Sequence, residues 1–210
     1  MYRLNLIIGV VAFTLIVTGI LPWAAVAGSE SESQSSIEQI FQKAKQDYVQ
    51  KNISSASEQI QKGAAYMKAE AAKASVKGKA ALTASAQELE ILADDVKKGT
   101  VTSVKGIEEA FARAYVALAS DSHIKSTEAW TKKQAAKAGD ALDSATKYLE
   151  RSLAWAGQKV EASTKEAMKK SEDISLKLKK KGSVVAEEVG KGLKDMGNEI
   201  EKFGKRISPK

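Results

Sequence analysis

The chain contains no cysteine, one histidine and two prolines among its 210 residues. The lack of cysteine excludes disulfides, thiol redox chemistry, iron–sulfur clusters and thioether-linked haem within the chain. A single histidine excludes a zinc site built from two or three histidines of one chain. The scarcity of proline and the abundance of Ala, Lys, Glu, Ser and Gln favour helices over sheets. Aromatic residues make up only 6%, so any core must consist largely of Ala, Leu, Ile and Val.

The first 27 residues form a separate segment. They carry one charge, Arg3, followed by an apolar run over Leu4–Leu21 and a helix breaker at Pro22. With the small residues Ala25 and Ala27, this pattern predicts a secretory signal peptide over 1–27 that is cleaved after Ala27. The apolar run approaches the length of a membrane span, so an uncleaved N-terminal helical anchor is the alternative. We therefore expect a protein that is located in the periplasm or is otherwise exported.

The remaining chain divides into a leader, a helical body and a tail. Residues 28–35 are polar and Ser-rich, which predicts a flexible leader. Helical periodicity then extends over 36–182. The sequence predicts a first helix up to a corner at Lys51-Asn52 and a long second helix over 53–96. The second helix has a seven-residue coiled-coil seam and is stopped by Lys97-Lys98-Gly99. A third helix over 104–130 and a fourth beyond a corner at 132–134 complete the body.

One segment of the body is similar to another. Residues 48–75 align without a gap on residues 130–157, an offset of 82 positions, with five identities in 28. Convergent composition of two Ala- and Lys-rich helices is one explanation, and duplication is the other. The ungapped register favours duplication, with repeats at 36–98 and 100–182. The predicted fold is all-α: an antiparallel four-helix bundle of two similar helical hairpins, followed by an amphipathic helix.

The tail, residues 183–210, contains an apolar stripe at helical spacing. Residues 158–210 also hold 14 Lys and Arg against 9 Asp and Glu, a net charge of +5. The stripe is therefore a candidate contact with a partner, with an anionic membrane surface or with the bundle itself, and we favour packing on the bundle or on a second subunit. It consists of Val185, Val189, Leu193, Met196, Ile200, Phe203 and Ile207.

No group of residues predicts catalysis. His123 lacks the Glu three residues earlier that a di-iron bundle site needs, because Ser120 stands there. Four acidic pairs lie among lysines on helical patterns, which indicates solvated faces rather than cation sites: 94–95, 108–109, 172–173 and 187–188. The chain has no Gly-rich phosphate loop, no nucleophile elbow and no calcium-binding loop. We predict a protein that is not an enzyme and has no cofactor or metal site.

Three functions remain. The leading hypothesis is an exported helical bundle with an interaction, structural or envelope-protective role, whose partner is a second copy or another envelope protein. The second is a lipid-associating protein that binds an anionic membrane surface through the tail stripe. The third and weakest is a binder of small apolar ligands near Trp130, Tyr148 and Trp155. Nucleic acid is not expected as a partner, because no aromatic residues are interleaved with the basic run at 177–181.

Overall fold

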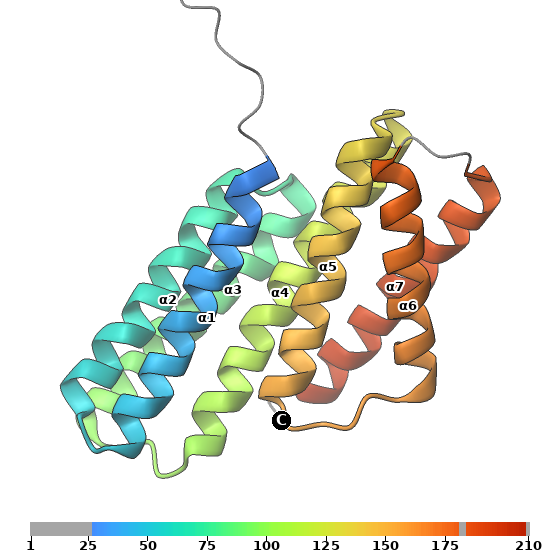
Figure 1. Cartoon of the computed structure of the whole chain (residues 1–210). Coiled ribbons are helices and arrows are strands. Elements are labelled where there is room, and N and C mark those ends of the chain that lie inside the picture. The colour runs from blue at the N-terminus through green and yellow to red at the C-terminus, as the bar shows by residue number, and fades with distance from the viewer. Residues whose placement is uncertain (1–26, 181–183, 209–210) are drawn as a thin grey trace, which may run out of the picture.

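The computed structural model describes residues 27–180 and 184–208, and these residues form helices joined by short loops without any strand (Figure 1). The all-α prediction is confirmed. The helices pack side by side as a bundle. In chain order they are α1 (Ala27–Val49), α2 (Ile53–Lys73), α3 (Val76–Lys98), α4 (Val104–Thr131), α5 (Ala135–Trp155), α6 (Ala162–Lys179) and α7 (Ala186–Ile207).

The N-terminal boundary of the body differs from the prediction. Helix α1 begins at Ala27, so residues 28–35, predicted to be a flexible leader, are helical. Beyond Gly28 this stretch contains only Ser, Glu and Gln, none of which breaks a helix. The predicted signal segment before Ala27 lies outside the described residues.

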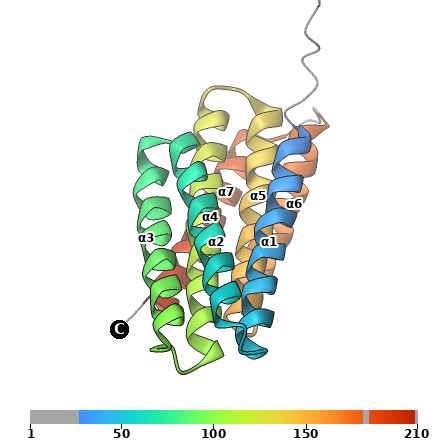
Figure 2. The same ribbon diagram turned by 90° about the vertical axis from the view of Figure 1, so that its left-hand side faces the viewer.

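The predicted long helix over 53–96 is wrong. The backbone becomes extended at Ala74 (ψ 156°) and Ser75 (ψ 162°), and the chain reverses direction there. The Ser75 hydroxyl accepts a hydrogen bond from the amide of Gly78 and so caps the first turn of α3. Helices α2 and α3 therefore lie antiparallel, as Figures 1 and 2 show. Small residues happen to continue the seven-residue pattern across Ser75, although the helix itself ends there.

A second reversal follows α5. Gly157 adopts a left-handed conformation (φ 61°), and α6 runs back along α5 instead of extending it. The described residues thus form seven helices, not four and a tail, because two predicted helices are each divided by a turn. The body is a helical bundle, but not the predicted four-helix arrangement.

The two predicted corners share one backbone geometry. Lys51 and Lys133 both occupy the left-handed region, with φ of 62° and 58°. After each of them, the amide of the next residue donates to the carbonyl five positions earlier, Asn52 to Asp47 at 2.8 Å and Gln134 to Ala129 at 2.9 Å. Helices α2 and α5 then begin and end at positions that are 82 residues apart. Each corner is made by hydrogen bonds within the chain and needs no glycine.

Aromatic rings fill the centre of the body between α1, α4 and α5. Phe41 and Phe111 are stacked with ring centroids 4.0 Å apart, and Trp155 meets both edge-on. Tyr115 also contacts Phe41 edge-on. All four side chains are buried. Elsewhere the helix interfaces combine buried alanines with larger aliphatic side chains such as Leu82, Leu89 and Leu142.

Candidate functional site

The apolar stripe of α7 faces the body. Six of its seven residues are buried, and only Val185, just before the helix, is exposed. Helix α7 packs mainly on α4 and α6, which it crosses at an angle (Figure 1). Phe203 is 2% exposed and Met196 is fully buried. In this arrangement the stripe contributes to the core and is not presented to solvent.

Glycines on α7 permit this close packing. A Cβ atom on Gly197 would lie 2.7 Å from Cε1 of His123, and one on Gly192 would lie 2.2 Å from Cδ1 of Ile174. A Cβ on Gly190, by contrast, would meet nothing within 4 Å. Two of the glycines that lower the intrinsic stability of α7 therefore bring its backbone against α4 and α6.

The first polar cluster ties α1 to α4 and α5 through Glu38. Its carboxylate accepts hydrogen bonds from Tyr115 Oη at 2.6 Å, from Trp155 Nε1 at 3.3 Å and from Gln42 Nε2 at 2.8 Å. Burial raises the pKa of Glu38, but these hydrogen bonds, with the charge of Arg151, outweigh burial and leave the pKa below its usual value. Burial and the bond to Glu38 raise the pKa of Tyr115. The cluster holds a fixed carboxylate without an adjacent nucleophile, so it fits a structural role.

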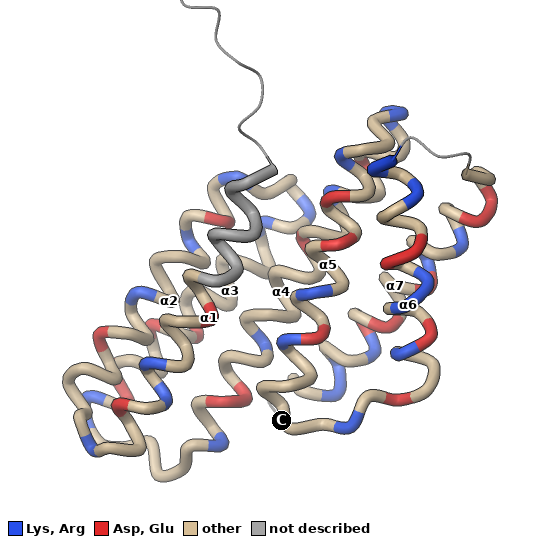
Figure 3. Tube along the Cα trace, viewed as in Figure 1, with Lys and Arg blue, Asp and Glu red and all other residues tan. Residues whose placement is uncertain are grey.

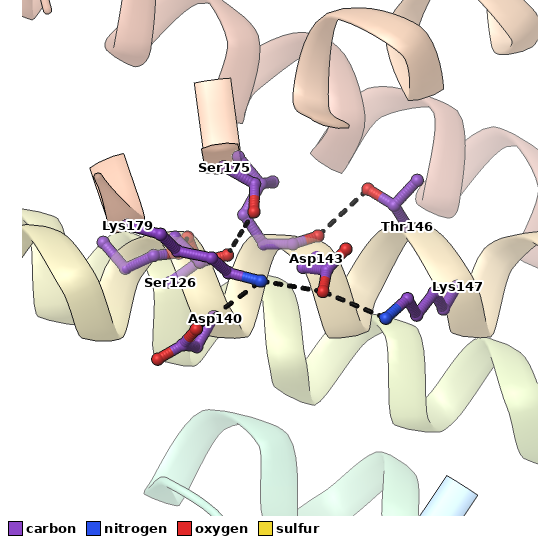
Figure 4. A network of polar contacts seen from close by, with 10 residues as sticks. Ser126, Asp140, Asp143, Thr146, Lys147, Ser175 and Lys179 are labelled. Carbon is purple, nitrogen blue, oxygen red and sulfur yellow. Dashed lines mark hydrogen bonds and ion pairs between the residues drawn. The ribbon is translucent and has the colours of Figure 1, made fainter. Parts of the chain in front are cut away.

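The second cluster joins α5 to α6 (Figure 4). Lys179 Nζ lies 2.9 Å from Asp143 and 3.5 Å from Asp140, and Lys147 contacts the same Asp143 oxygen at 3.1 Å. Burial opposes ionisation of Asp143, but the two lysines lower its pKa overall. Beside this network, Ser175 donates to the carbonyl of Gly139 at 2.9 Å. Every charge in the cluster has an opposite charge beside it, so the network links two helices.

His123 is held against α7. Its Nε2 lies 2.8 Å from the carbonyl oxygen of Leu193 and donates to it. Burial lowers the pKa of His123, although the hydrogen bond to Leu193 acts in the opposite direction. The ring therefore links α4 to α7 as a neutral imidazole.

Three of the four acidic pairs contribute ion pairs with lysines, and two of them meet at one lysine. Glu108 pairs with Lys45 at 2.6 Å, while Asp173 and Glu188 share Lys177. Within residues 27–180 and 184–208, no group of three or more His, Asp and Glu side chains has the geometry of a metal site.

The three residues of the predicted ligand cleft lie in or against the core. Tyr148 and Trp155 are 6% and 7% exposed and belong to the core, with Trp130 packed against its edge. A groove of about 720 Å³ lies elsewhere, between α3 and α7 with α4 as its floor. Its lining combines small side chains with the Arg113–Glu88 ion pair and the edge of His123.

Two buried polar residues were not predicted, and one of them, Ser85, lines this groove. Ser85 is 6% exposed and its hydroxyl has no hydrogen-bond partner within the described structure. Asp121 is 3% exposed, and one carboxylate oxygen contacts Lys125 at 2.7 Å while the other has no partner there. Burial raises the pKa of Asp121, and Lys125 only partly offsets this. Both residues read in the sequence as ordinary polar positions of a helix, so no local signal distinguishes them.

Charge is dispersed over the described helices. Figure 3 shows Lys and Arg interspersed with Asp and Glu along each helix whose residues it colours. The basic residues of α6 and α7 are largely neutralised by acids nearby, as in Lys170–Asp195 and Lys202–Glu161. None of the described helices combines the length and hydropathy that a membrane span requires. Comparison of the chain with protein-family models, curated proteins and solved structures finds no match in any of the three.

Proposed function

We propose that the protein is an exported, non-enzymatic helical scaffold with an interaction or structural role in the cell envelope. The observation that supports this proposal is that the polar clusters described above link helices to one another. Glu38, Lys179 and His123 each join two or more helices, and each is engaged by protein groups. Polar side chains that hydrogen-bond between helices fix the relative positions of those helices, as a structural scaffold requires. Export follows from the signal-like pattern of residues 1–27.

We further propose that the scaffold arose by duplication of a three-helix unit, so that α1–α3 correspond to α4–α6 and α7 begins a third unit. The offset of 82 relates the start of α4, Val104, to the start of α7, Ala186. The same offset relates five buried positions of α3 to five buried positions of α6, from Leu82 and Thr164 at one end to Val96 and Leu178 at the other.

A hydrogen bond between helices supports this correspondence. Ser57 on α2 donates to the carbonyl of Ala93 on α3 at 2.8 Å. At the equivalent positions, Ser175 on α6 donates to the carbonyl of Gly139 on α5 at 2.9 Å. The donor lies on the first helix of one pair (α2) and on the second helix of the other pair (α6). The two positions in contact are nevertheless equivalent in both pairs. A shared helix-pair geometry accounts for this better than shared composition does.

The membrane hypothesis requires α7 to detach. Its apolar stripe is buried against α4 and α6, and its acidic residues Glu188 and Asp195 bond lysines of α6. Binding to an anionic surface would have to replace both sets of contacts. The scaffold role therefore fits the packing of α7 better than the lipid-binding role does.

Site-specific photo-crosslinking in the cells of origin tests the scaffold role. A photoreactive residue is placed singly at exposed positions of different helices, such as Gln61 on α2, Lys147 on α5 and Lys191 on α7. We expect discrete heavier species, in the envelope fraction, from one face and not from the others. Mass spectrometry of the uncrosslinked protein should give Gly28 as the first residue. Absence of crosslinks from all faces, or recovery in the cytoplasm, would contradict the proposal.

A further inference from the structure

Several small side chains line the groove between α3 and α7, together with longer charged and aliphatic ones. Ala81 and Ala84 come from α3, Ala117 forms part of the floor on α4, and Gly197 and Gly204 lie on α7. In the neighbouring core, larger side chains fill the space between helices. In the groove, small residues on facing helices leave that space open. The volume of about 720 Å³ falls within the range of roughly 300–1,000 Å³ that is typical of small-molecule sites.

Ser85 supplies one unused polar group in this lining. Its hydroxyl exposes less than 1 Å² and has no partner in the described structure. A buried hydroxyl without a hydrogen bond is unfavourable, because it has lost its contact with water and gained no partner. A serine in a helix commonly bonds the carbonyl four residues earlier, but Ser85 makes no such bond. Alanine would pack equally well in a groove that had only a structural role.

Four of the five charged side chains that line the groove are paired with one another. Arg113 donates from Nε to Glu88 at 2.7 Å and from Nη1 to the carbonyl of Ile207 at 3.1 Å, which fixes the guanidinium at one end of the groove. Lys205 lies 2.5 Å from Glu201 on the opposite wall. These four side chains sum to no net charge. The fifth, Lys194, makes no ion pair within the described structure, but it is exposed, so water solvates its charge. A charged ligand group beside Ser85 would have to compete with one of these pairs, whereas a neutral oxygen would not.

We propose that this groove binds an uncharged, largely apolar molecule carrying one hydroxyl or carbonyl oxygen, such as a fatty alcohol. Its hydrocarbon part lies along Ala81, Ala84 and Ala117, and its oxygen accepts a hydrogen bond from Ser85. Because the hydroxyl exposes less than 1 Å², a neighbouring side chain must shift for the ligand oxygen to reach it. The proposal is independent of the scaffold role, and it places an apolar ligand away from Trp130, Tyr148 and Trp155.

NMR titration of the full-length chain with 1-dodecanol tests the proposal, with dodecanoate as the charged probe of equal chain length. We expect saturable shifts of the Gly197 and Gly204 amides, none at the distant Gly99 and Gly157, and weaker binding of dodecanoate. Uniform shifts at all four glycines, or no shift up to the solubility limit, would overturn the proposal. Tighter binding of dodecanoate would overturn the uncharged ligand class.

Two variants separate binding from folding. Ser85→Ala should weaken dodecanol binding by about five- to tenfold, the effect of one hydrogen bond, while leaving the melting temperature unchanged or higher. Ser54→Ala, at an exposed position of α2, is the matched control and should change neither quantity. Ala84→Trp fills the groove from an exposed wall position and should abolish saturable binding. Unchanged affinity in Ser85→Ala or in Ala84→Trp would show that the alcohol binds elsewhere.

Discussion

The hydroxyl of Tyr115 on α4 donates a 2.6 Å hydrogen bond to the carboxylate of Glu38 on α1, 77 positions earlier in the chain. Tyr115 is 1% exposed, so the phenol has no access to water that could replace Glu38. The same carboxylate oxygen accepts a bond from Trp155 on α5. A single acidic residue therefore fixes three helices at the aromatic centre of the body.

Removal of either partner should lower the free energy of unfolding. We expect Tyr115→Phe to cost about 1.5–3 kcal/mol, because the bond has a charged acceptor and Tyr115 is buried. Glu38→Gln should cost a similar amount at neutral pH. Denaturant unfolding of both single variants and of the double variant checks this. The two effects should be clearly less than additive, and full additivity would mean that the residues do not interact.

Glu38 should also make stability depend on pH. Its pKa in the folded protein lies below the usual value of 4.5, so its ionised form is favoured in the folded state. This contribution is complete above about pH 4.5 and is lost as the pH falls through the folded pKa. Melting temperatures from pH 7 to pH 2 should therefore fall less steeply in Glu38→Gln than in the parent. An unchanged profile would show that Glu38 titrates normally.

Asp121 should have the opposite pH dependence. Burial raises its pKa, so ionisation destabilises the fold as the pH rises from the unfolded pKa through the folded one. Asp121→Asn removes the buried charge and should stabilise the protein by about 1 kcal/mol at pH 7, with no gain at low pH. Asp143→Asn is the control, because lysines stabilise that carboxylate and its replacement should be destabilising. Loss of stability in Asp121→Asn at pH 7 would contradict the assignment.

Two glycines of α7 should respond differently to alanine. Gly197→Ala places a methyl group 2.7 Å from the His123 ring, which is held by its bond to Leu193, and should cost about 1–3 kcal/mol. Gly190→Ala enters open space and should stabilise the helix by about 0.5–1 kcal/mol. Thermal unfolding of the pair measures the difference. Equal effects would mean that α7 does not pack on His123.

The buried stripe of α7 can be tested at its centre. Met196→Asp places an unpaired charge at a fully buried position and should cost about 3–5 kcal/mol. Lys191→Asp, on the exposed side of the same helix, should change stability by less than about 0.5 kcal/mol. Melting curves without lipid provide the measurement. If Met196→Asp melts like the parent, the stripe is free to bind a membrane or a partner.

Local patterns in the sequence predicted the parts of the fold that depend on neighbouring residues. The spacing of the apolar residues from Val189 to Ile207 predicted the buried face of α7, and Lys97-Lys98-Gly99 predicted the end of α3. The sharp reversal at Ser75 was missed because the apolar seven-residue pattern continued on both sides of it. Ser75 followed by a helix-starting turn was the available signal, since serine is a preferred N-cap residue.

The groove and the two buried polar residues could not be predicted in this way. Ser85 and Asp121 differ from other polar helix residues only in which helix covers them, and that depends on residues far away in the chain. The role of Gly197 likewise has no local signal, because the His123 ring that it contacts lies on another helix. Contacts between distant segments decide these roles, and one sequence alone does not contain them.

The position of α6 and α7 at one side of the body has a consequence for local unfolding. Their main contacts are with each other and with α4 and α5, whereas α1, α2 and α3 mainly contact one another and α4. The C-terminal pair can therefore open while the aromatic centre around Phe41 and Phe111 stays closed. Amide protons of α6 and α7 should then exchange with solvent by a subglobal opening, at lower free energy than those of α4, which is in contact with both groups.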